Sequence, residues 1–325
     1  MSVAWLALAL LVAWAVVLLR RDRRLPAVKP WIVKPSHIIP AALQILLFVW
    51  WGLHSDRVVD HVPEIVVQLA FAGAFEFLLA WTLHHPWQPG FGVLPVVLSA
   101  NLFVWFPSES FWLGFLVVAL ALASKQLLRW NGRHWFNPSV FGIAVVGSLC
   151  VLFPRLFHYT DISHLFASPP GMAALIFVLA LVPQLRFRIT PVAVGAAVGV
   201  VSLNLLCVGL FGYRHAPGLT WPPWLLAITF LLGDPATVPA ALLARFLFGL
   251  FAGVSFFFFS NGMSWLVGTD FFSKVLPIPF ANLLVPQFER AGAGLLARWP
   301  RLAGGNRLYL AIWVVFCAVG IATND

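Results

Sequence analysis

Charged side chains are scarce in this sequence of 325 residues. Asp, Glu, Lys and Arg together make up 10% of it, whereas soluble proteins carry about 25%. Apolar residues make up 61%, above the roughly 45–50% of a soluble domain. One soluble core cannot bury so much apolar surface, which excludes an ordinary globular domain. Lipid is the simplest environment for it, and only helices and closed barrels cross lipid.

Cysteine is also scarce, with three residues in the chain. Cys150, Cys207 and Cys317 lie at unrelated spacings inside apolar runs. This pattern excludes a disulfide framework and a cysteine metal motif, and it indicates small buried side chains. The adjacent His84 and His85 would point to different faces of a helix, so no metal site is predicted. The sequence also has no Walker loop, G-x-G-x-x-G motif or H-E-x-x-H motif.

The sequence is rich in apolar runs separated by short polar segments. Twelve runs are candidate transmembrane spans: Val3–Leu19, Ile38–Leu53, Ile65–Leu83, Val93–Phe106, Phe111–Leu127, Val140–Phe153, Met172–Leu185, Val192–Phe211, Trp224–Leu232, Phe246–Phe259, Ile278–Val285 and Leu308–Ile321. A straight span needs about 20 apolar residues, so we expect Trp224–Leu232 and Ile278–Val285 to be broken or re-entrant. The predicted fold is an all-α polytopic transmembrane bundle of ten to twelve spans.

Basic residues lie between the runs and are unevenly distributed. If the spans alternate, Arg57, Arg155, Arg214 and Lys274 fall on one side and the other sixteen Lys and Arg on the opposite side. Because basic loops stay in the cytoplasm, this predicts a bacterial inner-membrane protein with both termini outside. The first run, Val3–Leu19, is followed by its arginines, unlike a cleaved signal peptide, and is read as a retained span. Topology explains the formal charge of +9, and no nucleic-acid partner is predicted.

One ionisable residue lies inside an apolar run. Glu76 has apolar neighbours on both sides within Phe71–Leu79. A charge facing lipid at this place would cost at least about 2.5 kcal/mol, so we expect the side chain to face the bundle interior. Glu76 is either an ion or proton relay or ligand contact, or a neutral, hydrogen-bonded core acid.

The segment Lys125–Gly142 contains a helix-start pattern. Pro138 suits the first turn of a helix, and Asn137 before it can act as the cap. The free N–H groups of this start, with Arg129, Arg133 and His134 nearby, are suited to binding an anion. The alternative is a well-capped helix flanked by arginines that set the topology.

Asp234 and Asn282 are two further polar residues beside short apolar runs. Asp234 precedes a proline in Leu231–Ala240, a pattern that predicts a turn at a helix end. Asn282 lies inside Ile278–Val285, where its amide must find hydrogen-bond partners. We therefore expect Asn282 to contact another span.

Several short motifs follow one another from about Gly90 to about Arg290. They are Lys125-Gln126-Leu127, Asn131-Gly132, Phe136-Asn137-Pro138-Ser139, Gly233-Asp234-Pro235-Ala236-Thr237, Gly249 with Gly253, and Pro279-Phe280-Ala281-Asn282-Leu283-Leu284-Val285-Pro286. Their order and their placement relative to the spans are more specific than any single motif. Together they resemble the membrane family of NqrB and RnfD, subunits of the sodium-pumping NADH:quinone reductase and of the Rnf electron-transport complex.

The resemblance implies a helical membrane subunit that carries flavin and passes electrons across a bilayer, coupled to movement of sodium or protons. Its partners would be other membrane electron-transfer subunits or quinone, and in an enzyme it would be an electron-carrying subunit. The matching positions proposed for cofactor binding are Lys125, Asn137, Pro138, Asp234, Thr237 and Asn282. The chain then divides into an N-terminal span with a basic inner loop (1–35), a ten-span core (36–290) and a basic inner loop with a C-terminal span (291–325).

One feature of the family is missing. NqrB and RnfD attach FMN to a threonine of an Ala-Thr motif in an outer loop. The corresponding loop, Pro154–Gly171, has one threonine, Thr160, with neighbours that do not match, and Ala236-Thr237 lies on the inner side. We therefore expect no covalent FMN, and either a non-covalent flavin (FMN or riboflavin) or none. The alternatives to an electron-transfer subunit are a cofactor-free transporter and a membrane scaffold of a biosynthetic assembly.

Overall fold

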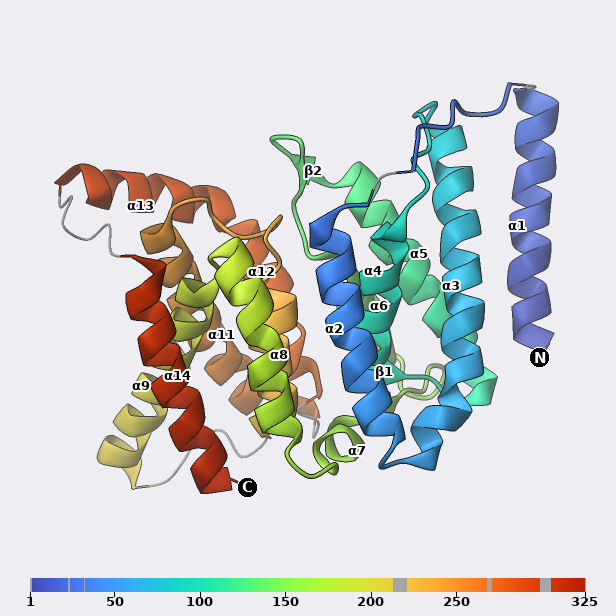
Figure 1. Cartoon of the computed structure of the whole chain (residues 1–325). Helices are drawn as coiled ribbons and strands as arrows, with labels where there is room; N and C mark the ends of the chain where they lie inside the picture. Colours follow the sequence, from blue (N-terminus) through green and yellow to red (C-terminus); the bar gives the residue numbers. More distant parts are fainter. Residues whose placement is uncertain are drawn as a thin grey trace. The chain divides into compact units, whose positions relative to one another are not determined.

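The chain folds almost entirely into helices, as a computed structural model shows (Figure 1). The described residues are 2–22, 24–31, 33–212, 221–267, 271–298 and 305–324. They form two compact units, of which unit 1 comprises Met1–Leu128 and Phe141–Ile162, and unit 2 comprises Arg129–Val140 and Ser163–Asp325. The predicted all-α class is confirmed, and the boundary between the units falls inside the stretch 36–290 that the resemblance treats as one core.

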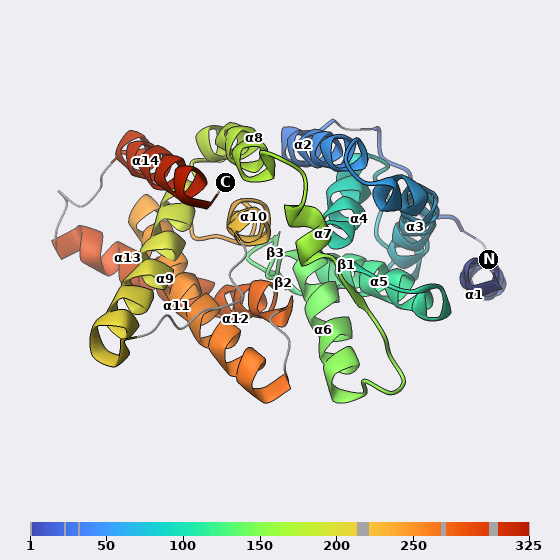
Figure 2. The same cartoon turned by 90° about the horizontal axis from the view of Figure 1, so that it is seen from below.

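Unit 1 is a bundle of helices with one short strand pair. Its helices are α1 (Ser2–Arg21), α2 (Pro35–Gly52), α3 (Asp56–Thr82), the 3₁₀ turn η1 (Phe91–Val93), α4 (Leu94–Asn101), the 3₁₀ turn η2 (Ser108–Ser110), α5 (Trp112–Leu127) and α6 (Pro138–Leu152), whose first turn belongs to unit 2. Strand β1 (Val104–Trp105) pairs antiparallel with β4 (Thr160–Asp161). Helix α1 lies at the edge of the unit, against α3 and α5 (Figure 2).

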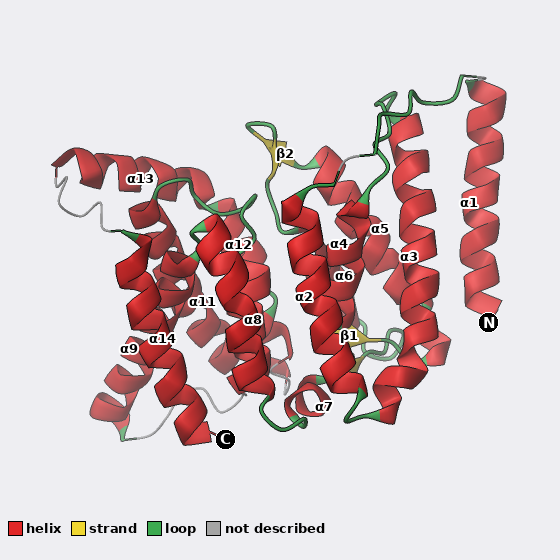
Figure 3. Cartoon of the chain, in the orientation of Figure 1, coloured by secondary structure: helices red, strands yellow, loops and turns green. Residues whose placement is uncertain are grey.

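Unit 2 begins with a hairpin of strands β2 (Arg129–Trp130) and β3 (Arg133–His134). Its helices are α7 (Ser163–Ala167), α8 (Met172–Phe187), α9 (Thr190–Phe211), α10 (Trp221–Leu226), the π-helical η3 (Ala227–Leu232), α11 (Leu242–Val267), the 3₁₀ turn η4 (Phe271–Lys274), α12 (Pro277–Leu283), α13 (Val285–Arg298) and α14 (Asn306–Asn324). Strands contribute very little to either unit, as the colouring by secondary structure makes plain (Figure 3).

The two units share an order of elements. In unit 1, two long helices (α2, α3) precede the short α4, an extended segment and the apolar α5. In unit 2, α8 and the long α9 precede the short α10–η3, a non-helical stretch and α11. A short helix that ends within an apolar bundle exposes backbone groups that need partners, and in transporters such breaks often build binding sites.

Within the part of the chain that the structure describes, five helices are long and apolar enough to cross a membrane, and on that basis the chain is a membrane protein. They are Ala4–Arg21, Pro35–Gly52, Asp56–Thr82, Thr190–Phe211 and Leu242–Gly262. Six further apolar helices are shorter, and the expected short runs are indeed short: Trp224–Leu232 lies within α10–η3, and α12 has seven residues. Arg214, which the topology places in an outer loop, lies outside the described residues.

The predicted span Val93–Phe106 is wrong as a single helix. Helix α4 ends at Asn101, and the chain then runs extended through β1. The indole N–H of Trp105 donates to the carbonyl oxygen of Asn101 at 2.8 Å, which is the acceptor that the Trp105 backbone N–H would use in a continued helix. Hydropathy alone cannot separate a buried extended run from a helix.

Helices α9 and α11 approach each other through glycines. Gly195 and Gly199 of α9 face Gly249 and Gly253 of α11 at a four-residue spacing. A Cβ added at Gly249 would collide with the carbonyl oxygen of Val192, and the other three glycines are equally close to the opposite backbone. Between membrane helices, small residues permit close backbone contact, so this glycine seam holds the core of unit 2 together.

Candidate functional site

Glu76 forms an ion pair with Lys125 inside unit 1. Glu76 comes from the C-terminal half of α3 and Lys125 from the last turn of α5. Lys125 Nζ lies 3.3 Å from Glu76 Oε1, and the side chains are 19% and 14% exposed. Each charge offsets part of the cost of burying the other. Two residues that the sequence singled out in separate segments are therefore one charged pair.

A glycine and a histidine lie beside this pair. Lys125 Nζ also lies 3.5 Å from the carbonyl oxygen of Gly92, in η1. A Cβ added at Gly92 would lie 3.1 Å from Lys125 Nζ and 3.3 Å from Cε1 of His37, at the start of α2. The absence of a side chain at Gly92 thus leaves room for the ammonium and the imidazole. Segments from α2, α3, η1 and α5 thus meet around Gly92 and Lys125.

In unit 2, Asn282 is the centre of a second polar cluster. Its side chain is completely buried in α12. The Oδ1 atom accepts a hydrogen bond from the backbone N–H of Asn137 at 3.2 Å, and Nδ2 donates to the carbonyl oxygen of Thr237 at 3.2 Å. The Asn282 carbonyl oxygen accepts from the Trp135 indole at 3.0 Å. The amide has partners on other segments of the chain, but they lie at the cap of α6 and in the turn after η3 and not inside another span.

Asn137 connects the start of α6 to the end of η3. Its Nδ2 donates to the carbonyl oxygen of Leu231 at 2.8 Å. Its Oδ1 accepts from Ser139 Oγ at 2.9 Å and from the backbone N–H of Val140 at 3.4 Å. Pro138 occupies the first helical position, where no N–H is needed. The side chain of Asn137 therefore caps α6, which supports the capped-helix interpretation over an anion site.

The hairpin β2–β3 brings two basic side chains to the cluster. Asn131 (φ 49°) and Gly132 (φ 77°) both have left-handed backbone conformations, as a two-residue type I′ turn requires. After this turn, Arg133 lies 3.1 Å from the Glu289 carboxylate and His134 Nε2 lies 3.2 Å from Asp234 Oδ2. These contacts hold the hairpin against the segment after η3 and against α13.

Asp234 and Thr237 form the turn that the sequence predicts. Asp234 Oδ1 accepts from the backbone N–H of Ala236 at 3.0 Å, and Thr237 Oγ1 lies 3.3 Å from the Asp234 carbonyl oxygen. Asn137, Pro138, Asp234, Thr237 and Asn282 thus share one cluster in unit 2, whereas Lys125 and Glu76 belong to unit 1.

Two polar features were not found from the sequence. Lys274, counted as an outer-loop residue in the topology, is buried at 1% exposure, and its Nζ donates to Ser163 Oγ at 3.0 Å. In unit 1, His61, Gln68 and Asn101 form a buried network on α3 and α4. The signal for this network is the 3–4 spacing of Val58, His61, Ile65, Gln68 and Ala72, which marks one buried face of α3.

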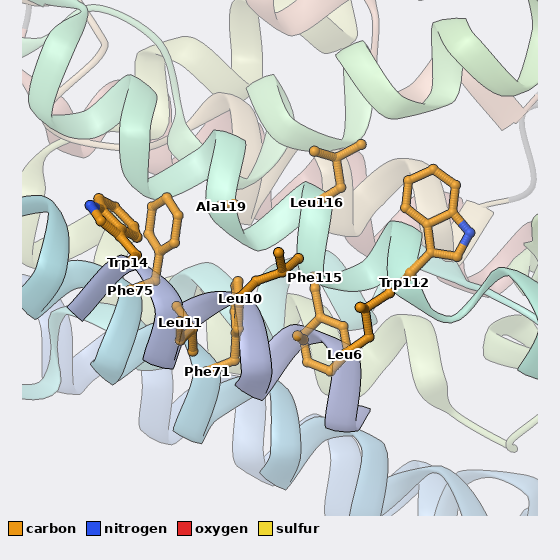
Figure 4. Close-up of a pocket in the computed structure, with 11 residues that line it drawn as sticks. Leu6, Leu10, Leu11, Trp14, Phe71, Phe75, Trp112, Phe115, Leu116 and Ala119 are labelled. Carbon is orange, nitrogen blue, oxygen red and sulfur yellow. The ribbon is translucent and has the colours of Figure 1, made fainter. Parts of the chain in front are cut away.

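Unit 1 also contains an apolar cavity of about 320 Å³ between α1, α3 and α5. Aromatic side chains point into it from all three helices, with Trp14, Phe71, Phe75 and Phe115 among them (Figure 4). Its volume lies at the lower end of the range for small-molecule sites. Because the lining is almost wholly apolar, the cavity suits a hydrocarbon chain and provides no anchor for a polar ring.

No model of a known protein family matches the chain, and no curated protein matches its sequence.

Proposed function

We propose that this chain is a multi-pass subunit of a bacterial inner membrane that moves a cation, sodium or a proton, in connection with electron transfer. The observation that carries the cation part is the ion pair of Glu76 and Lys125. Glu76 lies in a helix long and apolar enough to span a bilayer. Ionisable groups at such positions mark ion pathways and proton relays, because their cost is otherwise hard to explain.

The pair has a simple way to exchange a cation. A proton or a sodium ion that binds the Glu76 carboxylate competes with the Lys125 ammonium for the same oxygen atoms. Lys125 then retains the Gly92 carbonyl oxygen as an acceptor, at 3.5 Å. Release of the cation restores the pair. In the cation-bound state Lys125 keeps this acceptor but loses its counter-charge, so the bound state is the costlier of the two and favours release.

The electron-transfer part of the proposal is supported by the order of motifs that resembles NqrB and RnfD. A non-covalent flavin, FMN or riboflavin, would supply the redox chemistry. The side-chain amides of Asn137 and Asn282 already form hydrogen bonds within the protein. These two residues would therefore position the segments around a flavin and would not bind it directly. Arg133 and His134, which are partly exposed, have N–H groups suited to a ring carbonyl or a phosphate. Quinone or other membrane subunits would exchange the electrons.

One preparation tests both parts. The purified chain is reconstituted in vesicles, and proton and sodium flux are measured for the unmodified protein and for Glu76→Gln. We expect Glu76→Gln to reduce the flux to the level of protein-free vesicles, because the amide keeps the shape but cannot exchange the cation. Glu109→Gln is the matched control, since Glu109 is exposed and accepts a hydrogen bond from its neighbour Ser108.

The same vesicles report on electron transfer. Protein denatured after extensive dialysis should release a flavin detectable by absorbance and mass spectrometry, and external dithionite should reduce ferricyanide trapped inside. Cation flux without flavin or electron transfer would instead establish a cofactor-free transporter, the alternative that the Glu76–Lys125 pair also favours. Equal flux for the unmodified chain and Glu76→Gln would refute the cation part.

A further inference from the structure

The apolar cavity of unit 1 is a groove that runs lengthwise along α1. Trp14 and Phe75 lie at one end of it, and Leu6 and Trp112 lie at the other end (Figure 4). The distance from Leu6 to Trp14 along the helix axis is about 12 Å. An elongated groove with an apolar lining suits a flexible hydrocarbon chain, because a polar molecule would lose its hydrogen bonds to water there.

Lipid hydrocarbon surrounds the open side of this groove. Helices α1 and α3, which form two of its walls, are both long and apolar enough to cross a membrane. Leu10 lines the groove and is nevertheless 63% exposed, so the groove opens to the outside of unit 1 past this residue. An apolar cavity of about 150 Å³ stays free of water and takes up apolar molecules. The groove is larger, at about 320 Å³, so we expect a lipid chain to enter it and to complete the dispersion contacts of its lining.

One face of α1 connects the groove to positive charge. Residues at intervals of three and four positions share one face of a helix. On α1 such a face comprises Leu6, Leu10, Trp14, Val17 and Arg21. Arg21 follows Leu10 by three turns, about 16 Å along the axis, which is close to half the thickness of a bilayer's hydrocarbon core. A phospholipid with its headgroup at Arg21 can therefore reach the groove with an acyl chain.

The last turn of α1 is suited to an anionic headgroup. It contains Arg20 and Arg21, and both side chains are exposed. The next residue, Asp22, lies 3.4 Å from Nδ1 of His84 and accepts a hydrogen bond from the backbone N–H of Arg24. The two guanidinium groups can therefore donate to a phosphate, and basic side chains at a membrane surface attract anionic lipids.

Two sets of contacts attach α1 to α3 and leave the gap toward α5 for the chain. The Trp14 indole N–H donates to Thr82 Oγ1 at 3.1 Å, and the Trp14 ring packs edge-on against Phe75 at a centroid distance of 5.4 Å. Nearer the end of α1, its buried leucines pack against Leu78 and Trp81 of α3. The wall on α5 consists of Trp112, Phe115, Leu116 and Ala119.

We infer that this groove, together with Arg21, is a binding site for one anionic phospholipid, whose acyl chain lies between α1, α3 and α5. The site is separate from the cation pathway proposed at Glu76, and it requires neither that pathway nor a flavin. The bound lipid attaches α1 more firmly to the rest of unit 1, because few side chains of α1 are buried within the protein.

Native mass spectrometry of the full chain, delipidated in detergent, tests this inference. The protein is titrated with phosphatidylglycerol, or with phosphatidylcholine that has identical acyl chains. We expect one phosphatidylglycerol to bind per chain, about fivefold or more tightly than phosphatidylcholine, because only phosphatidylglycerol has a net negative headgroup. Equal affinities for the two lipids would overturn the assignment of an anionic headgroup.

Two substitutions fill the groove from opposite walls. Leu10→Trp should weaken phosphatidylglycerol binding about tenfold or more, because the indole takes the volume of several buried methylene groups. Ala119→Leu, a smaller change on α5, should act in the same direction, and thermal unfolding verifies that each variant folds. Leu8→Trp is the matched control, since Leu8 is an exposed residue of α1 that does not line the groove. Equal binding by all three variants would overturn the groove as the site.

The headgroup contact has its own pair of variants. Arg21→Gln should weaken phosphatidylglycerol binding about fivefold and leave phosphatidylcholine binding unchanged. Arg307→Gln removes the same charge from an exposed arginine at the start of α14, and it should affect neither lipid. The same loss in Arg21→Gln and Arg307→Gln would show a general effect of charge and would overturn the role given to Arg21.

Discussion

A polar side chain is stable within an apolar bundle only when its hydrogen bonds are complete. Asn282 meets this condition, since its amide oxygen, its amide NH₂ group and its backbone carbonyl oxygen all have partners within unit 2. These partners belong to different segments, so one side chain holds the start of α6 and the turn after η3 against α12. Each of these hydrogen bonds adds little net free energy, but leaving one unmade is costly. The main contribution of Asn282 is therefore to fix these three segments in their positions.

Asn282→Ala removes few atoms but should destabilise the protein strongly. It leaves the backbone N–H of Asn137 and the carbonyl oxygen of Thr237 without their present partner, at about 1–3 kcal/mol for each buried group. Thermal unfolding in detergent measures the loss. Gln287→Ala, an exposed position nearby, is the matched control and should change stability by less than about 0.5 kcal/mol. Equal unfolding temperatures for the two variants would contradict the role given to Asn282.

Prediction from the sequence succeeds for some of these residues and fails for others. Asn282 is conspicuous because its neighbours are apolar, so a partner could be expected without knowing which one. His61 was missed because the predicted span began at Ile65, which left it in a loop, whereas α3 begins at Asp56. Pairs such as Glu76 with Lys125, 49 positions apart, follow from packing and leave no local pattern.

Among the elements, α9 and α11 have a very close backbone contact. The glycine seam works because its four residues lack side chains at the points where the two backbones touch. Close approach increases dispersion contact and lets weak polar interactions form between backbones, which matters in lipid because apolar burial alone gives little preference for helix association.

Gly249→Ala should separate these helices. The new methyl group would collide with the Val192 backbone, and overpacking of this kind costs about 1–3 kcal/mol. Gly262→Ala on the same helix is the control, because nothing lies within 4 Å of the added Cβ, and it should be neutral or slightly stabilising. Unfolding in a detergent series compares the two. The seam would lose its structural role if Gly249→Ala were as stable as Gly262→Ala.

Element boundaries show what hydropathy can and cannot predict. The ends of α1, α2, α5, α6 and α14 lie within a few residues of the predicted runs. Val93–Phe106 fails because the end of α4 depends on the Trp105 indole, which takes the carbonyl oxygen of Asn101. The partner strand of β1 lies at Thr160–Asp161, far along the chain, and a local window cannot contain it.

At the scale of the whole molecule, unit 1 has opposite charges at its two ends. At the N-terminal end of α3, the acidic residues Asp56, Asp60 and Glu64 outnumber the single arginine, Arg57. The other end of α3 is joined to basic segments, since the backbone N–H of Lys29 donates to the carbonyl oxygen of Trp87 at 2.8 Å and Asp22, beside Arg20 and Arg21, pairs with His84. This division is independent of how the shorter helices are counted, and it favours a cytoplasmic basic end.

The orientation of α3 provides the decisive test of the topology. In a background without Cys150, Cys207 and Cys317, a single cysteine is introduced by Asp56→Cys or by His85→Cys, both exposed positions beyond opposite ends of the apolar stretch. A membrane-impermeant maleimide should label Asp56→Cys in intact bacteria and His85→Cys only after lysis. The two variants control for each other, because each must react once the membrane is opened. Labelling of His85→Cys alone in intact cells would reverse the orientation and place the Glu76–Lys125 end of the bundle outside.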